Sequence, residues 1–202
     1  MKAVRCFYGF LLFTLLFLLT DCKQRILHHK AKFNVYIDNS FIKENKINQV
    51  IDGVLAWEQA STGVVSFNIL IAKDVNESTI KNATLNEVGD DYAIFIINAQ
   101  SKNVPSALKR EDLIGLNTTV NGLNVIYIFS DRLIQYNTEA SIVYKALTTH
   151  EVGHAIGLSH IDDINSIMFS VITASPLCIT KLDMDQFCKL YYCNNHKLNY
   201  CQ

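Results

Sequence analysis

The chain has 202 residues, with 18 basic and 19 acidic side chains and a formal net charge of −1. A chain of this length can bury the core of one domain. The balanced charge excludes the broad positive surface of a nucleic-acid-binding protein and an acidic tail. We therefore expect a single domain that is monomeric and has no nucleic-acid partner.

Residues 1–21 have the features of a signal peptide: an early positive charge, followed by an apolar run from Phe7 to Leu19 that is too short to span a membrane. Cys22 follows directly, in a context that resembles a bacterial lipoprotein signal, where a cysteine becomes the lipidated first residue. Asp21 departs from that pattern, since Gly, Ala or Ser is usual there. Lipid anchoring through Cys22, simple secretion and an uncleaved anchor all remain open, and each places the chain outside the cytoplasm. Residues 22–32 are then a short linker.

The next segments alternate between strand and helix patterns. Phe33–Ile37 alternates apolar and polar residues and predicts a strand. A helix follows, capped at Asn39-Ser40 and ending before Thr62-Gly63, because its apolar residues recur on one helical face. Val64–Ala72 predicts a second strand. Tyr92–Ile97 predicts a third strand, which is apolar enough to be buried on both faces.

The second half of the chain continues this pattern. Leu113–Leu116 is a short strand candidate, Asn121-Gly122 a turn, and residues 124–129 another strand. Thr138 can cap a long helix, and Thr180 can cap a final helix in which Asp183 completes a capping box. This order predicts one α/β or α+β domain with a mixed sheet over residues 33–202.

Four cysteines lie in the last quarter of the chain. If Cys6 leaves with the signal peptide and Cys22 carries lipid, an even number remains, which in an exported protein predicts two disulfides with three possible pairings. Free buried thiols are the alternative, and a zinc-binding cysteine cluster is the least favoured because no C-x2-C pair is present. We expect these residues to attach the C-terminal segment to the domain: Cys178, Cys188, Cys193 and Cys201.

One cluster of residues in the long helix carries chemistry. His150 and His154 are four apart, so that both imidazoles lie on one helical face and can reach one Zn²⁺. Glu151 points aside and can take a proton from a water molecule at the metal. Gly157 can adopt a positive φ, end the helix and turn the chain, so that His160 supplies a third nitrogen. Three protein ligands leave one position open, which is the catalytic arrangement of zinc.

This pattern, followed by Ser166-Ile167-Met168, resembles the metzincin signature, in which a Met-containing turn follows the zinc motif. The eight-residue step from His160 to Met168 resembles the matrixins, the family of matrix metalloproteinase catalytic domains and their simpler bacterial relatives. The resemblance implies a mostly parallel, twisted sheet with an active-site helix, a backing helix and a C-terminal helix. It also implies one catalytic zinc and protein or peptide substrates.

The resemblance assigns structural roles to Gly157 and Met168 and places the substrate against an edge strand. In this chain that strand matches Leu113–Asn117, so Ile114, Gly115 and Leu116 are the candidate substrate-binding residues. An ordinary internal strand is the alternative. The wall of the neighbouring pocket is expected from Phe169–Pro176. No metal-rich loop is recognisable between residues 102 and 121, so we expect no second zinc and leave calcium open.

Three functions compete. The first is a zinc-dependent endopeptidase in which Glu151 acts as general base and acid. The second is a non-catalytic metal-binding surface module of the same fold. The third is a metal-dependent hydrolase of something other than peptides, against which only the resemblance to the matrixins argues. The presence of Glu151 favours the enzyme, because a module that no longer cleaves peptides has no need of it.

Overall fold

The computed structural model describes most of the expected catalytic domain, in the ranges 31–73, 75, 80, 92–99, 113–133, 140–171, 177–193 and 197–201. The expected signal peptide, Cys22, nearly all of the linker and the cap at Thr138 lie outside these residues. None of the helices in the described ranges is long and apolar enough to cross a membrane.

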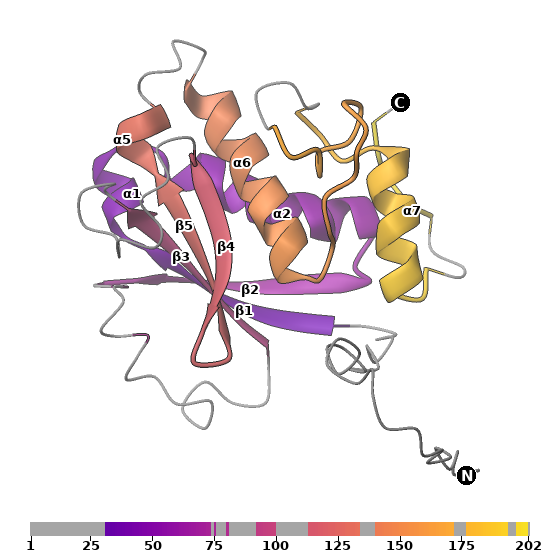
Figure 1. Cartoon of the computed structure of the whole chain (residues 1–202). Coiled ribbons are helices and arrows are strands. Elements are labelled where there is room, and N and C mark those ends of the chain that lie inside the picture. Colours follow the sequence, from indigo (N-terminus) through magenta and orange to yellow (C-terminus); the bar gives the residue numbers. More distant parts are fainter. Residues whose placement is uncertain are drawn as a thin grey trace, which may run out of the picture.

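A five-stranded sheet forms the centre of the domain, in the order β2-β1-β3-β5-β4 (Figure 1). The first four of these strands are parallel to their neighbours, and only β4 is antiparallel. The prediction of a mixed, mostly parallel sheet is therefore confirmed, and β4 is an edge strand. The strands are β1 (Ala31–Asp38), β2 (Val65–Ala72), β3 (Tyr92–Ala99), β4 (Gly115–Val120) and β5 (Leu123–Phe129).

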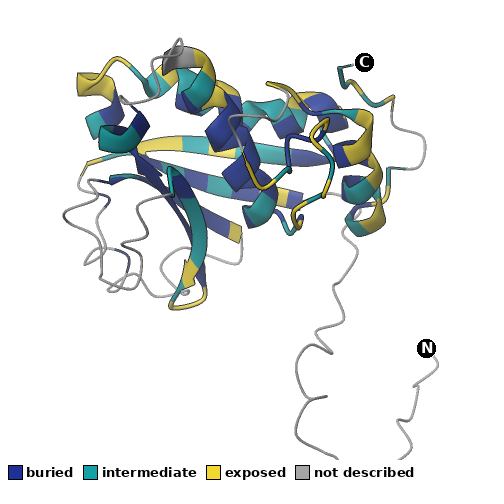
Figure 2. Ribbon diagram, turned by 45° about the horizontal axis from the view of Figure 1, so that its top comes forward, coloured by how far each residue is buried: buried dark blue, intermediate teal, exposed yellow. Residues whose placement is uncertain are grey.

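Two long helices, α2 (Ile47–Ser61) and α6 (Ala140–Ala155), pack on one face of the sheet (Figure 1). The two helices are in close contact: a Cβ atom added to Gly53 of α2 would lie only 2.6 Å from Cβ of Thr148 in α6. Trp57 fixes the pair, since its indole Nε1 donates to the carbonyl of Thr149 at 2.8 Å in the interior. Figure 2 shows the buried residues concentrated between these helices and the sheet. The helix that carries the histidines, α6, is thus packed against both α2 and the sheet.

The opposite face of the sheet is also covered. Alternate residues of β3 and β5, such as Phe95 and Tyr127, form a second apolar cluster with Val75 and Ile80. Residues 93–97 are consequently buried on both faces, as predicted, whereas Tyr92 at the start of the strand is 46% exposed.

Two element boundaries differ from the prediction. The single helix expected from Asn39 is two helices, α1 (Ser40–Lys43) and α2, because Asn45 adopts a left-handed φ of 56° between them. The strand candidate at Leu113–Leu116 begins only at Gly115 and continues to Val120. Its later residues are polar because an edge strand leaves part of its surface in water. A short helix, α5 (Ser130–Leu133), follows β5.

The last helix, α7 (Lys181–Leu190), begins at the predicted capping box of Thr180 and Asp183. Two disulfides form around it, which selects one of the three possible pairings: Cys178–Cys201 and Cys188–Cys193. The tail is attached to the end of α2 as well, since Asn199 N–H donates to the carbonyl of Ala60 at 2.9 Å. The prediction that the four cysteines attach the C-terminal segment to the domain is confirmed for Cys178–Cys201, whereas Cys188–Cys193 closes a local segment at the end of α7.

Candidate metal centre

The histidine cluster begins on the last turns of α6. His150 and His154 lie one turn apart on the same face, and their Nε2 atoms are 3.1 Å apart. His150 is buried and His154 is half-buried, so the pair sits where the helix leaves the core.

Gly157 brings the third histidine to this pair. Leu158 N–H donates to the carbonyl of Gly153 and Gly157 N–H to that of His154, both at 2.9 Å, which is the hydrogen-bond pattern of a Schellman cap. This cap requires a left-handed residue, and Gly157 has a φ of 101°. The chain then turns back and places His160 Nε2 at 3.2 Å from His154 Nε2. The predicted turn at Gly157 is confirmed.

The hydrogen bonds made by the Nδ1 atoms of His150 and His154 leave their Nε2 atoms in the form that binds a metal. His150 Nδ1 lies 2.7 Å from the carbonyl of Ile167 and His154 Nδ1 lies 2.9 Å from that of Leu158, so both rings carry their proton on Nδ1. Their Nε2 atoms are then bare lone pairs that face each other and would repel without a cation between them. Nitrogens about 2.0–2.1 Å from a tetrahedral Zn²⁺ lie about 3.3 Å apart, close to the spacing here.

Electrostatics favour the same form of the ligands. Burial lowers the pKa of His150 to about 4 and also lowers the pKa of His154. Both rings are therefore neutral near pH 7, and neutral imidazole is the form that binds metals. Among the described residues these three histidines are the one group of three or more His, Cys, Asp or Glu side chains that converge in this way.

Glu151 lies beside the cluster without belonging to it. Its carboxylate points toward the edge strand β4, where it accepts a hydrogen bond from the backbone N–H of Asn117 and would contact any side chain placed on Gly115. Burial raises the pKa of Glu151 to about 8, and the hydrogen bond from Asn117 opposes that rise. A nearby divalent cation would also favour the ionised carboxylate.

Met168 lies directly under the histidine helix. It is fully buried, and a Cβ on Gly153 would be only 2.4 Å from its sulfur. The carbonyl of Met168 accepts from the N–H of Ile161 at 3.0 Å, so this turn also holds the segment that follows His160. The residue packs as a core methionine beneath the helix that carries His150 and His154.

In the sequence Asp183 is recognisable only as part of a capping box, yet its buried carboxylate also holds the methionine turn. It accepts from the backbone N–H groups of Ile167 and Met168, at 3.1 and 3.3 Å, and from the hydroxyl of Ser166. Because the carbonyl of Ile167 accepts from His150, Asp183 orients a candidate zinc ligand through one intervening residue. The short Asp in place of the usual Glu of a capping box is the one local hint of this second role.

The candidate substrate-binding residues do not share one environment. Ile114 precedes β4, and its carbonyl is already used by Phe129 N–H of β5, at 3.0 Å. Hydrogen-bonded pairs alternate along antiparallel strands, so Leu116 also bonds to β5, while Gly115 and Asn117 direct their backbone groups to the outer edge of β4, where no other described strand pairs. The Asn-Gly turn was the signal for this register, because a two-residue hairpin fixes which pairs are hydrogen-bonded.

Known proteins resemble this chain in both sequence and fold. A family model described as matrixin matches residues 28–192. The fold is similar to that of metalloproteinase-II from Bacteroides fragilis, at a TM-score of 0.51 and 12% identity, covering 81% of this chain and 54% of that one. It is also similar to archaemetzincin from Methanopyrus kandleri, at a TM-score of 0.51 and 16% identity, covering 78% and 93%.

The chain thus spans about half the length of the Bacteroides protein. No curated protein matches it. At these identities the solved structures establish the fold alone, and the family model over most of the expected domain establishes the relationship. The resemblance of the zinc motif and the methionine turn to the metzincins is confirmed, and the chain belongs to the matrixin family of zinc metallopeptidases.

Proposed function

We propose that the chain is an endopeptidase that hydrolyses peptide bonds of proteins, with one zinc ion held by His150, His154 and His160. The observation that carries the proposal is the convergence of the Nε2 atoms of three imidazoles next to a buried carboxylate and an edge strand of the sheet. Zinc in such a site acts as a Lewis acid that polarises the scissile carbonyl and acidifies a water molecule.

Glu151 is the proposed general base and acid. It takes a proton from the attacking water and later delivers that proton to the nitrogen of the leaving amine. Its position supports this role, because it is next to a ligand in sequence, is 5% exposed and points to the side of the site where β4 lies. The N–H of Asn117 holds the carboxylate in that direction.

The substrate backbone is proposed to pair with the open edge of β4. The register supports the N–H and C=O of Gly115 and the C=O of Asn117 as the pairing groups, because they face away from β5, while the N–H of Asn117 donates to Glu151. Gly115 also leaves room for Glu151 to reach this edge, since a Cβ there would lie 2.7 Å from a carboxylate oxygen. Leu116 and Ile114 support the strand from its paired side.

The test compares the full mature chain with Glu151→Gln, which keeps the shape of the side chain and removes its basicity. We expect one zinc per chain in both proteins, measured by elemental analysis, and cleavage of a quenched peptide library that falls about 10²- to 10⁴-fold in the variant. A parent without zinc would refute the metal site. A variant that cleaves as fast as the parent would refute the role of Glu151, and a zinc-loaded parent without any cleavage would favour the non-catalytic module.

An extracytoplasmic location is part of the proposal. The two disulfides support it, because such bonds persist in oxidising compartments. Lipidation of Cys22 remains one of its forms, beside secretion and an uncleaved anchor. The mass of the mature N-terminus distinguishes the three, and size-exclusion chromatography with light scattering tests the expected monomer.

A further inference from the structure

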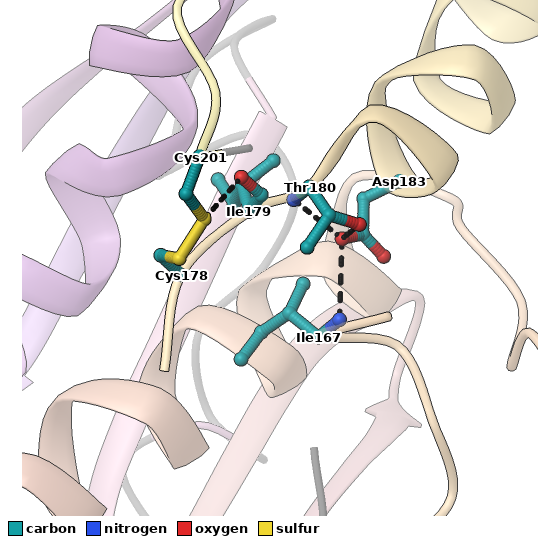
Figure 3. Close-up of a disulfide and its surroundings, with 6 residues drawn as sticks. All are labelled: Ile167, Cys178, Ile179, Thr180, Asp183 and Cys201. Atoms are coloured by element: carbon teal, nitrogen blue, oxygen red, sulfur yellow. Dashed lines mark hydrogen bonds between the residues drawn. A yellow bond between two sulfur atoms is a disulfide. The ribbon is translucent and has the colours of Figure 1, made fainter. Parts of the chain in front are cut away.

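The Cys178–Cys201 disulfide joins the C-terminal tail to the residues that lead into α7 (Figure 3). Beside the covalent bond, Cys201 N–H donates to the carbonyl of Ile179 at 3.0 Å. The tail itself is attached to the core, because Asn199 donates to the carbonyl of Ala60 at the end of α2. The start of α7 is therefore tied to a segment that is fixed elsewhere on the domain.

A chain of hydrogen bonds runs from this disulfide to the metal centre. Thr180 donates to a carboxylate oxygen of Asp183 through both its N–H and its hydroxyl, each at 2.8 Å. The same oxygen accepts from Ile167 N–H at 3.1 Å, and the carbonyl of Ile167 accepts from Nδ1 of His150 at 2.7 Å. Figure 3 shows Ile167 and Thr180 meeting at the Asp183 carboxylate, with the disulfide on the far side of Ile179.

Because Asp183 is buried, the hydrogen bonds that lead from Thr180 to His150 are sensitive to a displacement of Thr180. The residue is fully buried, so water does not replace donors that move away from its carboxylate. If Thr180 shifts, the Asp183 carboxylate loses two of its donors and is expected to move or to draw Ile167 with it. Either response changes the carbonyl that sets the ring orientation of His150.

We propose that the Cys178–Cys201 disulfide is a positioning element for the zinc ligand His150, and that its reduction by a dithiol weakens zinc binding. The inference rests on the proposed function only in requiring that the three histidines bind zinc. Cys178 is exposed and Cys201 half-buried, in a surface groove of about 560 Å³ that Lys181, Leu182 and Tyr200 also line. A small dithiol can therefore reach the bond.

The exchange reaction is balanced by the reductant. A dithiol supplies two electrons and two protons, its own sulfurs join in a disulfide, and the protein S–S bond is converted to two thiols. Reoxidation reverses the step. Zinc affinity then depends on the redox state of a bond that lies outside the metal site.

The second disulfide is a matched control. Cys188 and Cys193 are five residues apart and close a short segment at the opposite end of α7 from Asp183. Neither cysteine takes part in the hydrogen bonds that lead to His150 in the described residues. Removing this disulfide deletes one crosslink, as removing Cys178–Cys201 does, but leaves the hydrogen bonds from Thr180 to His150 in place.

The experiment measures Zn²⁺ affinity by chelator competition in four full-length proteins: the parent, Cys178→Ser/Cys201→Ser, Cys188→Ser/Cys193→Ser and Asp183→Asn. All four are measured well below their melting temperatures, with circular dichroism to establish that they are folded. We expect affinity to fall about 10-fold in the first double variant and up to about 100-fold in Asp183→Asn, the range for lost partners of metal ligands. The control double variant keeps the affinity of the parent.

Co²⁺ in place of Zn²⁺ adds a readout that a general loss of stability does not change, since its visible absorption reports the geometry of the ligands. We expect the spectrum to change in Cys178→Ser/Cys201→Ser and not in the control. Should that variant fail to fold, the parent is reduced with dithiothreitol, alkylated with iodoacetamide and freed of reagent before the same titration. Mass spectrometry identifies the alkylated cysteines.

Unchanged zinc affinity and an unchanged Co²⁺ spectrum, after loss of the Cys178–Cys201 bond by either route, would overturn the inference while leaving the proposed function intact. Equal losses in the two double variants would overturn it too, because the effect would then be a general loss of stability. A parent that binds no zinc would instead overturn the proposed function and, with it, this inference.

Discussion

Replacing Gly115 by alanine tests whether the contact between the edge strand and the helix sets the position of Glu151, the proposed catalytic base. The added methyl group would lie 2.6 Å from Cδ1 of Leu147 and 2.7 Å from Oε1 of Glu151, whereas ordinary contacts begin near 3.4 Å. Leu147 is 2% and Glu151 5% exposed, so neither side chain can move into solvent without other changes. The carboxylate or the strand must therefore shift by about 0.7 Å, the difference between 3.4 and 2.7 Å.

The size of the effect follows from that displacement. Added volume in a packed interior costs about 1–3 kcal/mol of stability, which lowers the melting temperature of a domain of this size by about 2–12 °C. A misplacement approaching 1 Å at a catalytic group can lower the rate about 100-fold. We expect kcat to fall about 10- to 100-fold, with KM and zinc content nearly unchanged, because the methyl group reaches Glu151 and not the metal ligands.

The assay is steady-state cleavage of a peptide substrate, together with zinc analysis and thermal melting of each protein. Gly53→Ala is the control, because it introduces the same methyl group against the other side of α6, where it would lie 2.6 Å from Thr148. The collision with Thr148 is expected to lower the stability of Gly53→Ala, and the better helix propensity of alanine offsets part of that loss. We expect kcat to stay within a few-fold of the parent value. The reasoning is refuted if Gly115→Ala keeps the kcat of the parent, or if Gly53→Ala loses as much activity.

Three further predictions concern the framework of the site. Trp57→Phe removes the indole donor to Thr149 and should lower the free energy of unfolding by about 1–3 kcal/mol in urea titrations, with zinc stoichiometry unchanged. Gly157→Ala meets no close neighbour but forces a φ of 101° on a residue with a Cβ, so we expect His160 to shift and zinc affinity to fall in chelator competition. Burial raises the pKa of Tyr144 to about 12, above its value of about 10 in an unfolded chain, so the fold favours the neutral phenol. Its contribution to stability is complete below about pH 10 and is lost as the pH rises toward 12, so urea midpoints at about pH 8 and about pH 11 should differ less in Tyr144→Phe than in the parent.

Local patterns in the sequence predicted the elements that carry the site. His150 and His154 are recognisable because the helical repeat is a property of consecutive residues, and Gly157 because a left-handed residue is needed wherever a helix ends in this way. The capping box at Thr180 is equally local, and the structure contains it. The strands of the sheet were also predicted, except that β4 is longer and begins two residues later than expected.

Contacts between distant segments were not readable in this way. The second role of Asp183 requires Ile167 to lie against the start of α7, and nothing in the neighbouring residues indicates that approach. The disulfide pairing had three possibilities, and only the return of the tail to the start of α7 selects Cys178–Cys201. The sequence grouped Ile114 and Leu116 with Gly115, whereas pairing with β5 separates them by the direction of their backbone groups.

The sequence by itself determined the donor set, its order along the chain and the family, because a metal site built on one helix and one turn is encoded within eleven residues. Only the tertiary structure decided what holds that site in place. Gly115 beside Glu151, Trp57 under the helix and Asp183 beneath Ile167 each depend on the packing of segments that are far apart in the chain. Such packing is set by shape and burial over the whole domain, which no short pattern records.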